Sequence, residues 1–146
     1  VDCATSFLLT PGVAQIFYGD ETGRKLSDAQ YNVDSDQAFR SDMNWNDINP
    51  ELLLHFQKLG QIRHDNPVIG TGKQRTLDAH TCLRYNDTDS LLIRLMPNEW
   101  KPIPVSSIWK DGTKVQELYT GQVIEVKAGK VAFPFYQNRI AILKAL

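Results

Sequence analysis

The 146-residue chain has 42% hydrophobic and 23% charged residues, a composition that favours a folded globular protein and excludes global disorder. Its formal net charge of −1 argues against nucleic acid as the main partner, because there is no basic excess to neutralise phosphates. No apolar run reaches the roughly 20 residues of a membrane-spanning helix, so no membrane partner is expected. The chain begins with Val1 rather than Met, which favours a fragment or a processed product.

The first predicted elements are a helix, a turn and a strand. Residues 1–9 (VDCATSFLL) are small and apolar, which is typical of the end of a helix, and Pro11-Gly12 is expected to stop it. Residues 13–18 (VAQIFY) are apolar or aromatic except for one glutamine. This continuous rather than alternating apolarity predicts a strand that is buried on both faces, as in parallel sheets.

A long loop and a helix are predicted next. Residues 19–49 are polar and lack periodicity, and a loop of that length in a compact domain is usually functional or disordered. The sequence Asn-Pro-Glu at 49–51 is a strong helix start, because Asn caps, Pro suits the first helical position and an early acid favours the helix dipole. Apolar residues then recur every three or four positions on one face. We therefore predict a helix over residues 50–65.

The rest of the chain, residues 71–146, is predicted to be an antiparallel β domain. Short partly alternating runs are separated by turns, at a spacing typical of sandwiches and barrels, and Asp-Gly at 111–112 is a strong hairpin signal. The expected strands lie within residues 90–96, 105–109, 114–119, 122–127, 130–135 and 139–146.

Asp20 and Glu21 are the first candidate site residues. Paired carboxylates can hydrolyse glycosides, with the two carboxyl groups about 5–5.5 Å apart in retaining enzymes. However, adjacent residues that leave a strand point to opposite sides, so these two would not easily flank one bond. The alternative that the sequence favours is a pair of hydrogen-bonded loop formers at the end of the strand 13–18.

Arg40 and the tryptophans are candidate sugar contacts. Arg40 could bind a sugar hydroxyl or hold a carboxylate in a bidentate pair, and the nearby Trp45 could stack on a sugar ring. The alternative is a loop that is held down by an ion pair of Arg40 and by a buried Trp45. Trp100 lies in a proline-flanked loop and is a second candidate for sugar stacking, against the alternative of a Trp that covers the edge of the β domain.

The cysteines and histidines show no metal-site spacing. Cys3 and Cys82 leave open a disulfide bridge or two free buried thiols, and the count favours the thiols. His55, His64 and His80 are expected at surface positions. No Zn ligand set, nucleotide fingerprint or Ser-His-Asp arrangement is found, so spacing alone identifies no catalytic or metal-binding residue.

Four segments resemble one known family. Residues 8–21 (LLTPGVAQIFYGDE) are similar to the segment around the eighth barrel strand of α-amylase-family glycoside hydrolases, apart from Ala14, where the family more often has Pro. Residues 39–45 (FRSDMNW) resemble the Arg-x-x-Met-x-Trp element that follows it. Residues 52–69 resemble the eighth barrel helix, and residues 115–144 resemble the closing strands of the C-terminal β domain.

The resemblance implies a fold in two parts. Residues 1–70 are expected to be the last βα unit of a TIM (β/α) barrel, with strand 13–18, loop 19–49 and helix 50–65. Residues 71–146 are expected to be the C-terminal β-sandwich domain.

The resemblance also implies a function for the parent protein. The parent would be a retaining hydrolase that cleaves α-glucosidic bonds in starch, glycogen or maltooligosaccharides. The family's catalytic carboxylates lie upstream of the resembling segments, so no residue here is expected to be catalytic and the chain alone is expected to be inactive. Arg40 matches an arginine that binds sugar, while Asp20 and Glu21 match structural residues of the barrel rim. The resemblance is compatible with Ca²⁺ in the parent and implies no cofactor for this part.

Two further points stay open at this stage. The β domain could instead be a non-catalytic module that binds glucan through Trp100 or Trp109, or that simply shields the barrel. A single barrel strand leaves its edges and apolar faces unpaired. Residues 1–18 are therefore expected to pack on the helix and the β domain in a non-barrel way, to pair with another copy through strand 13–18, or to lack order. The compartment of the parent, whether secreted, periplasmic or cytoplasmic, is left undecided.

Overall fold

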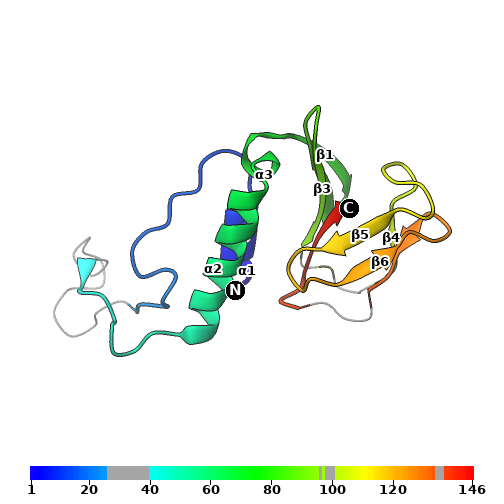
Figure 1. Ribbon diagram of the computed structural model, residues 1–146. Helices are drawn as coiled ribbons and strands as arrows, with labels where there is room; N and C mark the ends of the chain where they lie inside the picture. The colour runs from blue at the N-terminus through cyan, green and yellow to red at the C-terminus, as the bar shows by residue number, and fades with distance from the viewer. Residues whose placement is uncertain (26–39, 96, 98–100, 134–136) are drawn as a thin grey trace.

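The computed structural model describes residues 1–25, 40–95, 97, 101–133 and 137–146, and the account below concerns these residues (Figure 1). Three helices and eight strands follow one another along them. None of the helices is long and apolar enough to cross a membrane.

The helices come first in the chain. Helix α1 covers Asp2–Leu8, α2 covers Pro50–Asp65, and the short α3 covers Val68–Thr71. Helix α2 spans the range over which the sequence predicts a helix. Its start is fixed locally, because the side-chain oxygen of Asn49 accepts a hydrogen bond from the backbone N–H of Leu52 at 3.0 Å.

The strands form one large and one small sheet. The large sheet has six strands in the order β1-β2-β3-β8-β5-β6, and the small sheet pairs β4 with β7. Every described pairing is antiparallel, so the predicted antiparallel β region is confirmed. The strands are β1 Lys73–Asp78, β2 Thr81–Tyr85, β3 Ser90–Leu95, β4 Ile103–Pro104, β5 Lys114–Glu117, β6 Val123–Glu125, β7 Lys130–Val131 and β8 Ile140–Ala145.

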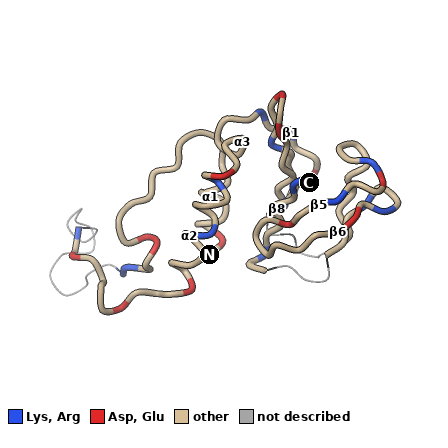
Figure 2. Tube along the Cα trace, viewed as in Figure 1, with Lys and Arg blue, Asp and Glu red and all other residues tan. Residues whose placement is uncertain are grey.

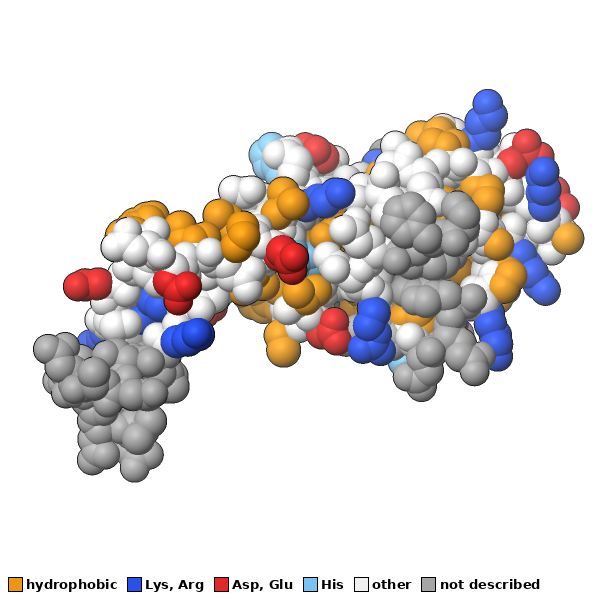
Figure 3. Space-filling model, turned by 90° about the horizontal axis from the view of Figure 1, so that it is seen from below, with side chains coloured by type: hydrophobic (Ala, Val, Ile, Leu, Met, Phe, Trp, Pro, Cys, Tyr) orange, Lys and Arg blue, Asp and Glu red, His pale blue; other side chains and the backbone are white. Residues whose placement is uncertain are grey.

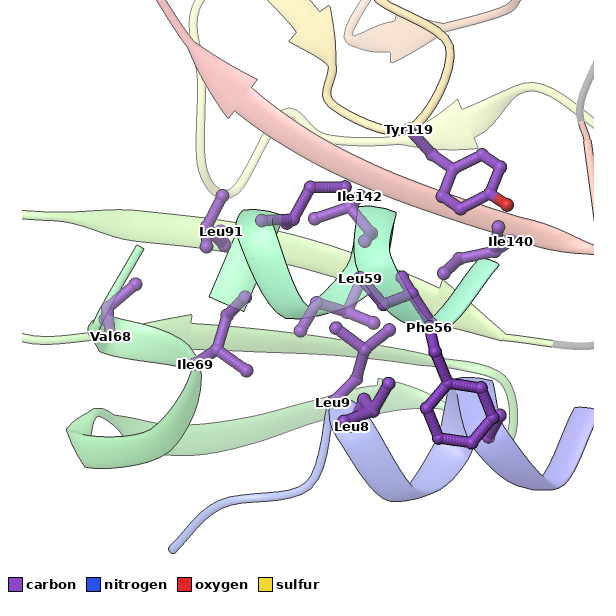
Figure 4. Close-up of a cluster of buried hydrophobic side chains, with 13 residues drawn as sticks. Leu8, Leu9, Phe56, Leu59, Val68, Ile69, Leu91, Tyr119, Ile140 and Ile142 are labelled. Carbon is purple, nitrogen blue, oxygen red and sulfur yellow. The ribbon is translucent and has the colours of Figure 1, made fainter. Parts of the chain in front are cut away.

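The large sheet is buried on both faces. Successive residues of a strand point to opposite faces, so Leu91 and Ile93 of β3 meet the helices while Leu92 meets the small sheet. The neighbouring strand β8 divides in the same way, with Ile140 and Ile142 on the helix side. Figure 4 shows this helix-side core between α1, α2 and the sheet. The described residues therefore form three layers: helices, large sheet and small sheet.

The predicted strand over residues 13–18 is absent. These residues have no regular structure, and no described residue pairs with them in a β-ladder. Val13 is 96% exposed, and Ile16, Phe17 and Tyr18 are between 40% and 48% exposed. A strand needs hydrogen-bonding neighbours along its length, and the described part of the chain supplies none here. The predicted burial of this segment is therefore wrong here, because residues that would cover it are not among the described ones.

Residues 9–25 and 40–49 form an arm that runs out from the helices and returns to α2 (left in Figure 1). The base of the arm is tied down where Gly12 donates its backbone N–H to the carbonyl oxygen of Gly70 at 2.8 Å. Figure 3, which views the molecule from below, shows hydrophobic side chains along the arm.

Candidate functional site

The two acids at the end of the predicted strand lie in a tight turn. Gly19 has a φ of 91°, a left-handed conformation that favours glycine, and its backbone N–H donates to the Glu21 carboxylate at 3.0 Å. Asp20 is exposed and donates its own N–H to the carbonyl oxygen of Phe17 at 3.1 Å. Glu21 therefore makes the local contact of a loop former. A structural role for both acids at a barrel rim stays a prediction.

The turn of residues 19–24 is joined to the returning half of the arm. The Thr22 hydroxyl lies 2.6 Å from the side-chain oxygen of Asn44, and the Asn44 amide donates to the Thr22 carbonyl at 3.2 Å. Arg24 donates to the Ser41 hydroxyl at 2.5 Å, and its guanidinium carbon lies 4.5 Å from the centroid of the Tyr18 ring. The Tyr18 hydroxyl in turn donates to the Ser41 carbonyl at 3.0 Å. These contacts fix the backbone on which Arg40 and Trp45 are carried.

The candidate sugar contacts of the arm are both open to solvent. Arg40 is exposed, and Trp45 is 71% exposed, so the alternative of a buried Trp45 is wrong. An exposed indole and an exposed guanidinium can both reach a ligand that lies over the arm. A substrate-binding role for Arg40 stays a prediction. Trp100 lies outside the described residues.

A hollow of about 410 Å³ lies between the arm, α1 and α2. Its walls combine apolar side chains such as Phe7, Ile16 and Phe56 with the charged groups of Asp20 and Arg24. No group of three or more His, Cys, Asp or Glu in the described part of the chain is placed to hold a metal ion. Figure 2 shows acidic and basic residues interspersed along the trace.

His55 differs from the surface position that the sequence predicted. It is 1% exposed, and its ring nitrogens lie 2.8 Å from the Thr5 hydroxyl and 2.8 Å from the Tyr119 hydroxyl. Burial lowers the pKa of the His55 ring. The apolar pattern of the helix did not predict this burial, because a polar side chain next to Phe56 is assigned to the solvent-exposed edge of the apolar face. Its partners come from distant parts of the chain.

The sequence analysis also did not predict the structural roles of two charged residues, Glu117 and Arg63. The buried Glu117 carboxylate accepts from the backbone N–H groups of Tyr119, Thr120 and Ile142. Arg63 of α2 donates to the carbonyl oxygen of Leu8, the last residue of α1, and to that of Thr10 after it. A signal existed for Glu117, because in β5 it shares the strand face of the buried Val115 and so faces inward.

The cysteines are both free, which confirms the thiols over the disulfide bridge. Cys3 is exposed and Cys82 is half-buried, so the expectation that both thiols are buried is wrong for Cys3. Burial raises the pKa of the Cys82 thiol, which makes it a poor nucleophile. Of the other histidines, His64 is exposed and His80 is half-buried.

Comparison with known proteins gives a consistent result. No protein-family model matches the chain. Two curated relatives match: a periplasmic alpha-amylase of Escherichia coli (strain K12), 40% identical over 96 residues, and a maltogenic alpha-amylase of Bacillus acidopullulyticus, 30% identical over 137 residues. The first match covers 62% of this chain and 14% of the relative, and the second covers 80% and 22%. The chain therefore spans less than a quarter of the length of these relatives.

Comparison with solved structures agrees with the sequence matches. The crystal structure of the alpha-amylase from Geobacillus thermoleovorans, complexed with acarbose, superimposes with a TM-score of 0.77 at 15% identity. The superposition covers 97% of this chain and 32% of that enzyme. At this identity the similarity concerns the fold alone. Together with the two curated relatives, it confirms the resemblance: the chain matches the C-terminal part of α-amylases.

Proposed function

We propose that this chain is the C-terminal part of a retaining α-amylase-family glycosidase that cleaves α-glucosidic bonds in starch, glycogen or maltooligosaccharides. The observation that carries the proposal is the match of nearly the whole chain to a limited part of α-amylases. One structurally similar enzyme binds acarbose, which supports an oligosaccharide ligand for the parent. The chain by itself is proposed to be inactive. A retaining glycosidase needs two carboxyl groups, one on each side of the scissile bond, and we propose that both lie in another part of the parent.

Activity of the isolated chain is the first test. The purified 146-residue chain is incubated with maltoheptaose, and reducing ends are measured beside the full-length protein that carries this segment. We expect release by the full-length protein and none by the chain. Turnover by the chain would contradict the assignment of the catalytic groups to another part of the parent. A full-length protein without activity on α-glucans would contradict the proposed substrate class.

The N-terminal half is proposed to be the last βα unit of a TIM barrel, with residues 13–18 as its strand and α2 as its helix. The support is the order of the elements and the unpaired apolar segment that precedes α2. In a closed barrel this segment would have a parallel neighbour on each side. Amide hydrogen exchange tests this: backbone amides of residues 13–18 should be protected in the full-length protein and unprotected in the isolated chain at concentrations where it is monomeric.

Arg40 is proposed to bind the sugar nearest the cleavage point. The support is its exposure on a backbone held by the contacts of Thr22, Arg24 and Asn44. In the full-length protein, Arg40→Ala should lower kcat/KM for maltooligosaccharides at least tenfold without changing the unfolding midpoint. Arg75→Ala, at an exposed position on the edge strand β1, is the matched control and should leave kcat/KM unchanged.

A second candidate is a structural or carbohydrate-binding role of the β region. The described residues favour the structural role, because Trp109 is 8% exposed and so offers little ring surface to a sugar. Titration of the chain with maltoheptaose should therefore leave its tryptophan fluorescence unchanged. A saturable change that Trp100→Ala removes would favour a binding module instead.

We propose no cofactor for this part of the protein, and a Ca²⁺ ion of the parent would have its ligands elsewhere. Addition of a chelator should then leave the thermal midpoint of the isolated chain unchanged. A lower midpoint in the chelator, restored by Ca²⁺, would place a metal site within these 146 residues.

A further inference from the structure

A buried polar cluster joins the helices to the large sheet. It consists of Thr5 from α1, His55 from α2, Tyr119 from the turn after β5, and Asn138 from the turn before β8. His55 and Tyr119 are 1% and 3% exposed. The cluster lies at the end of the helix-side core, where Tyr119 sits near Ile140 (Figure 4). It is thus a polar seam beside the apolar contacts that join these layers.

The hydrogen bonds of the seam close with one arrangement of protons. The Asn138 amide donates to the Tyr119 hydroxyl at 2.7 Å, so that hydroxyl donates its own proton to Nδ1 of His55 at 2.8 Å. Nε2–H of His55 then donates to the Thr5 hydroxyl at 2.8 Å, and Thr5 donates to the Val1 carbonyl at 3.0 Å. Each hydroxyl gives one proton and receives one bond. This arrangement requires a neutral His55 that carries its proton on Nε2.

A second proton on His55 forces the seam to rearrange. Nδ1–H would donate to the Tyr119 oxygen, 2.8 Å away, and the Tyr119 proton would then lose Nδ1 as its acceptor. Rotation of the Asn138 amide would let its oxygen accept that proton, in place of the present bond from the amide to Tyr119. The imidazolium would still be buried, with no carboxylate among its hydrogen-bond partners, and a buried charge without a counter-ion destabilises the folded state.

The charges around the seam do not compensate for an imidazolium. On α1, Asp2 favours a positive ring only from a distance, and its carboxylate pairs with Arg139 at 3.2 Å. On α2, the Lys58 ammonium lies over the Tyr119 ring, 4.6 Å from its centroid. On the sheet side, the Glu117 carboxylate accepts hydrogen bonds from its own turn and from β8.

We propose that His55 is an acid-sensitive latch between the helices and the large sheet, and that protonation of its ring loosens α1 and α2 from the sheet. This inference is independent of the proposed glycosidase function. The direction with pH follows from the neutral state of the folded ring. Burial lowers the pKa of His55 in the folded protein, while the unfolded chain keeps an ordinary value of about 6.5.

The sign of the pH effect is therefore fixed. Below about pH 6.5 the unfolded chain binds a proton that the folded chain does not, so stability falls as the pH falls. Within this window the unfolding equilibrium constant should rise by up to about tenfold for each pH unit, the limit for one proton. Above about pH 7, His55 is neutral in both states, and its contribution to the free energy of unfolding no longer changes with pH. Asp and Glu residues titrate at lower pH and add their own effects there.

The test measures urea unfolding of the 146-residue chain between pH 5 and pH 8, with exchange of the α1 amides in parallel. His55→Gln removes the titrating group, and its unfolding constant should change less with pH than that of the wild type, even if the variant is less stable throughout. His64→Gln, at an exposed position of the same helix, is the matched control and should keep the wild-type slope. Protection factors in α1 should fall with acid only where His55 is present.

Asn138→Asp is the second variant. Asp is nearly isosteric and tolerates the left-handed backbone of this position, where φ is 52°. Its carboxylate would accept from Nδ1–H of the imidazolium, so the loss of stability between pH 6.5 and pH 5 should become smaller or reverse.

Two results would overturn the proposal. One is an equal pH slope in the wild type and in His55→Gln. The other is a His55 ring that titrates at or above pH 6.5 by NMR in the folded wild type, with its resonance assigned by its loss in His55→Gln.

Discussion

The Nη1 atom of Arg63 in α2 lies 2.7 Å from the carbonyl oxygen of Leu8, the last residue of α1. The same guanidinium donates to the carbonyl oxygen of Thr10 at 2.8 Å and to that of Gly12. The last carbonyl groups of a helix lack partners within the helix, so Arg63 satisfies groups that α1 leaves open. One side chain thus joins the end of α1, the turn after it and α2.

Arg63→Ala should therefore lower the free energy of unfolding by about 1–3 kcal/mol, the range for hydrogen bonds made by a charged donor. Arg63→Lys should recover only part of this, because one ammonium does not reproduce the planar fork that reaches several carbonyl oxygens. Urea unfolding of the chain measures both. The control is Arg75→Ala on the exposed face of β1, expected within about 0.5 kcal/mol of the wild type. Equal losses for Arg63→Ala and Arg75→Ala would show that the contacts at α1 contribute little.

Glu117 is the next position where one change should be costly. Its carboxylate is fully buried and accepts from the N–H groups of Tyr119 at 3.1 Å, Thr120 at 2.6 Å and Ile142 at 3.0 Å. Glu117→Gln would turn an amide NH₂ toward some of these donors, leaving buried N–H groups unpaired. We expect a loss of about 2–3 kcal/mol in the free energy of unfolding.

The control for Glu117 is Glu125→Gln, which makes the same chemical change at an exposed position of β6. Its effect should stay within about 0.5 kcal/mol. Thermal unfolding of the two variants compares them directly. A Glu117→Gln protein as stable as Glu125→Gln would mean that the turn after β5 adapts to an amide without loss.

Elements with local causes could be predicted from the sequence. Helix α2 begins at Pro50 because Asn49 caps it and Pro fits the first position, and both signals lie within three residues of the helix start. The turn at 111–112 was also recognised, and the Asp111 carboxylate accepts from the N–H groups of Ala128 and Gly129 at 3.1 and 2.7 Å. The hairpin expected at this turn is wrong, because β5 pairs with β6 and β8 and not with the segment before the turn. The expected strand over 105–109 is instead a turn, in which Trp109 donates its N–H to the Val105 carbonyl at 2.8 Å.

Features with distant causes could not be predicted in the same way. The run 13–18 has the composition of a buried strand, but whether a strand forms depends on neighbours that the local pattern does not specify. His55 looked like a surface residue of α2 because its partners, Thr5 and Tyr119, lie far away in the sequence. A functional role for Arg40 and Trp45 stays a prediction from the sequence, which could not specify that contacts from Arg24 would hold the backbone near them.

The cap of α2 gives a simpler prediction. The Asn49 side-chain oxygen accepts from Leu52 N–H at 3.0 Å, so Asn49→Ala should cost about 1 kcal/mol of stability. Asn49→Asp retains the acceptor and adds a negative charge at the positive end of the helix, and it should be as stable as the wild type or slightly more so. Urea unfolding at pH 7 distinguishes the two variants. If both variants lose the same amount, the backbone N–H of Asn49, which donates to the Thr22 carbonyl at 2.9 Å, would be the main contact at this site.

The exposed run 13–18 predicts self-association of the isolated chain. Val13 is 96% exposed and Phe17 is 48% exposed, and the backbone of this segment has no β-ladder partner among the described residues. Apolar side chains beside unpaired N–H and C=O groups favour pairing with a second copy. Sedimentation velocity between about 5 and 200 µM should show a concentration-dependent increase in the weight-average sedimentation coefficient. Val13→Lys should suppress it, because a charge opposes edge pairing.

Val123→Lys is the matched control, at a 51% exposed position on the edge strand β6, and should leave the association unchanged. Suppression by Val123→Lys alone would assign the contact to the edge of the large sheet rather than to the arm.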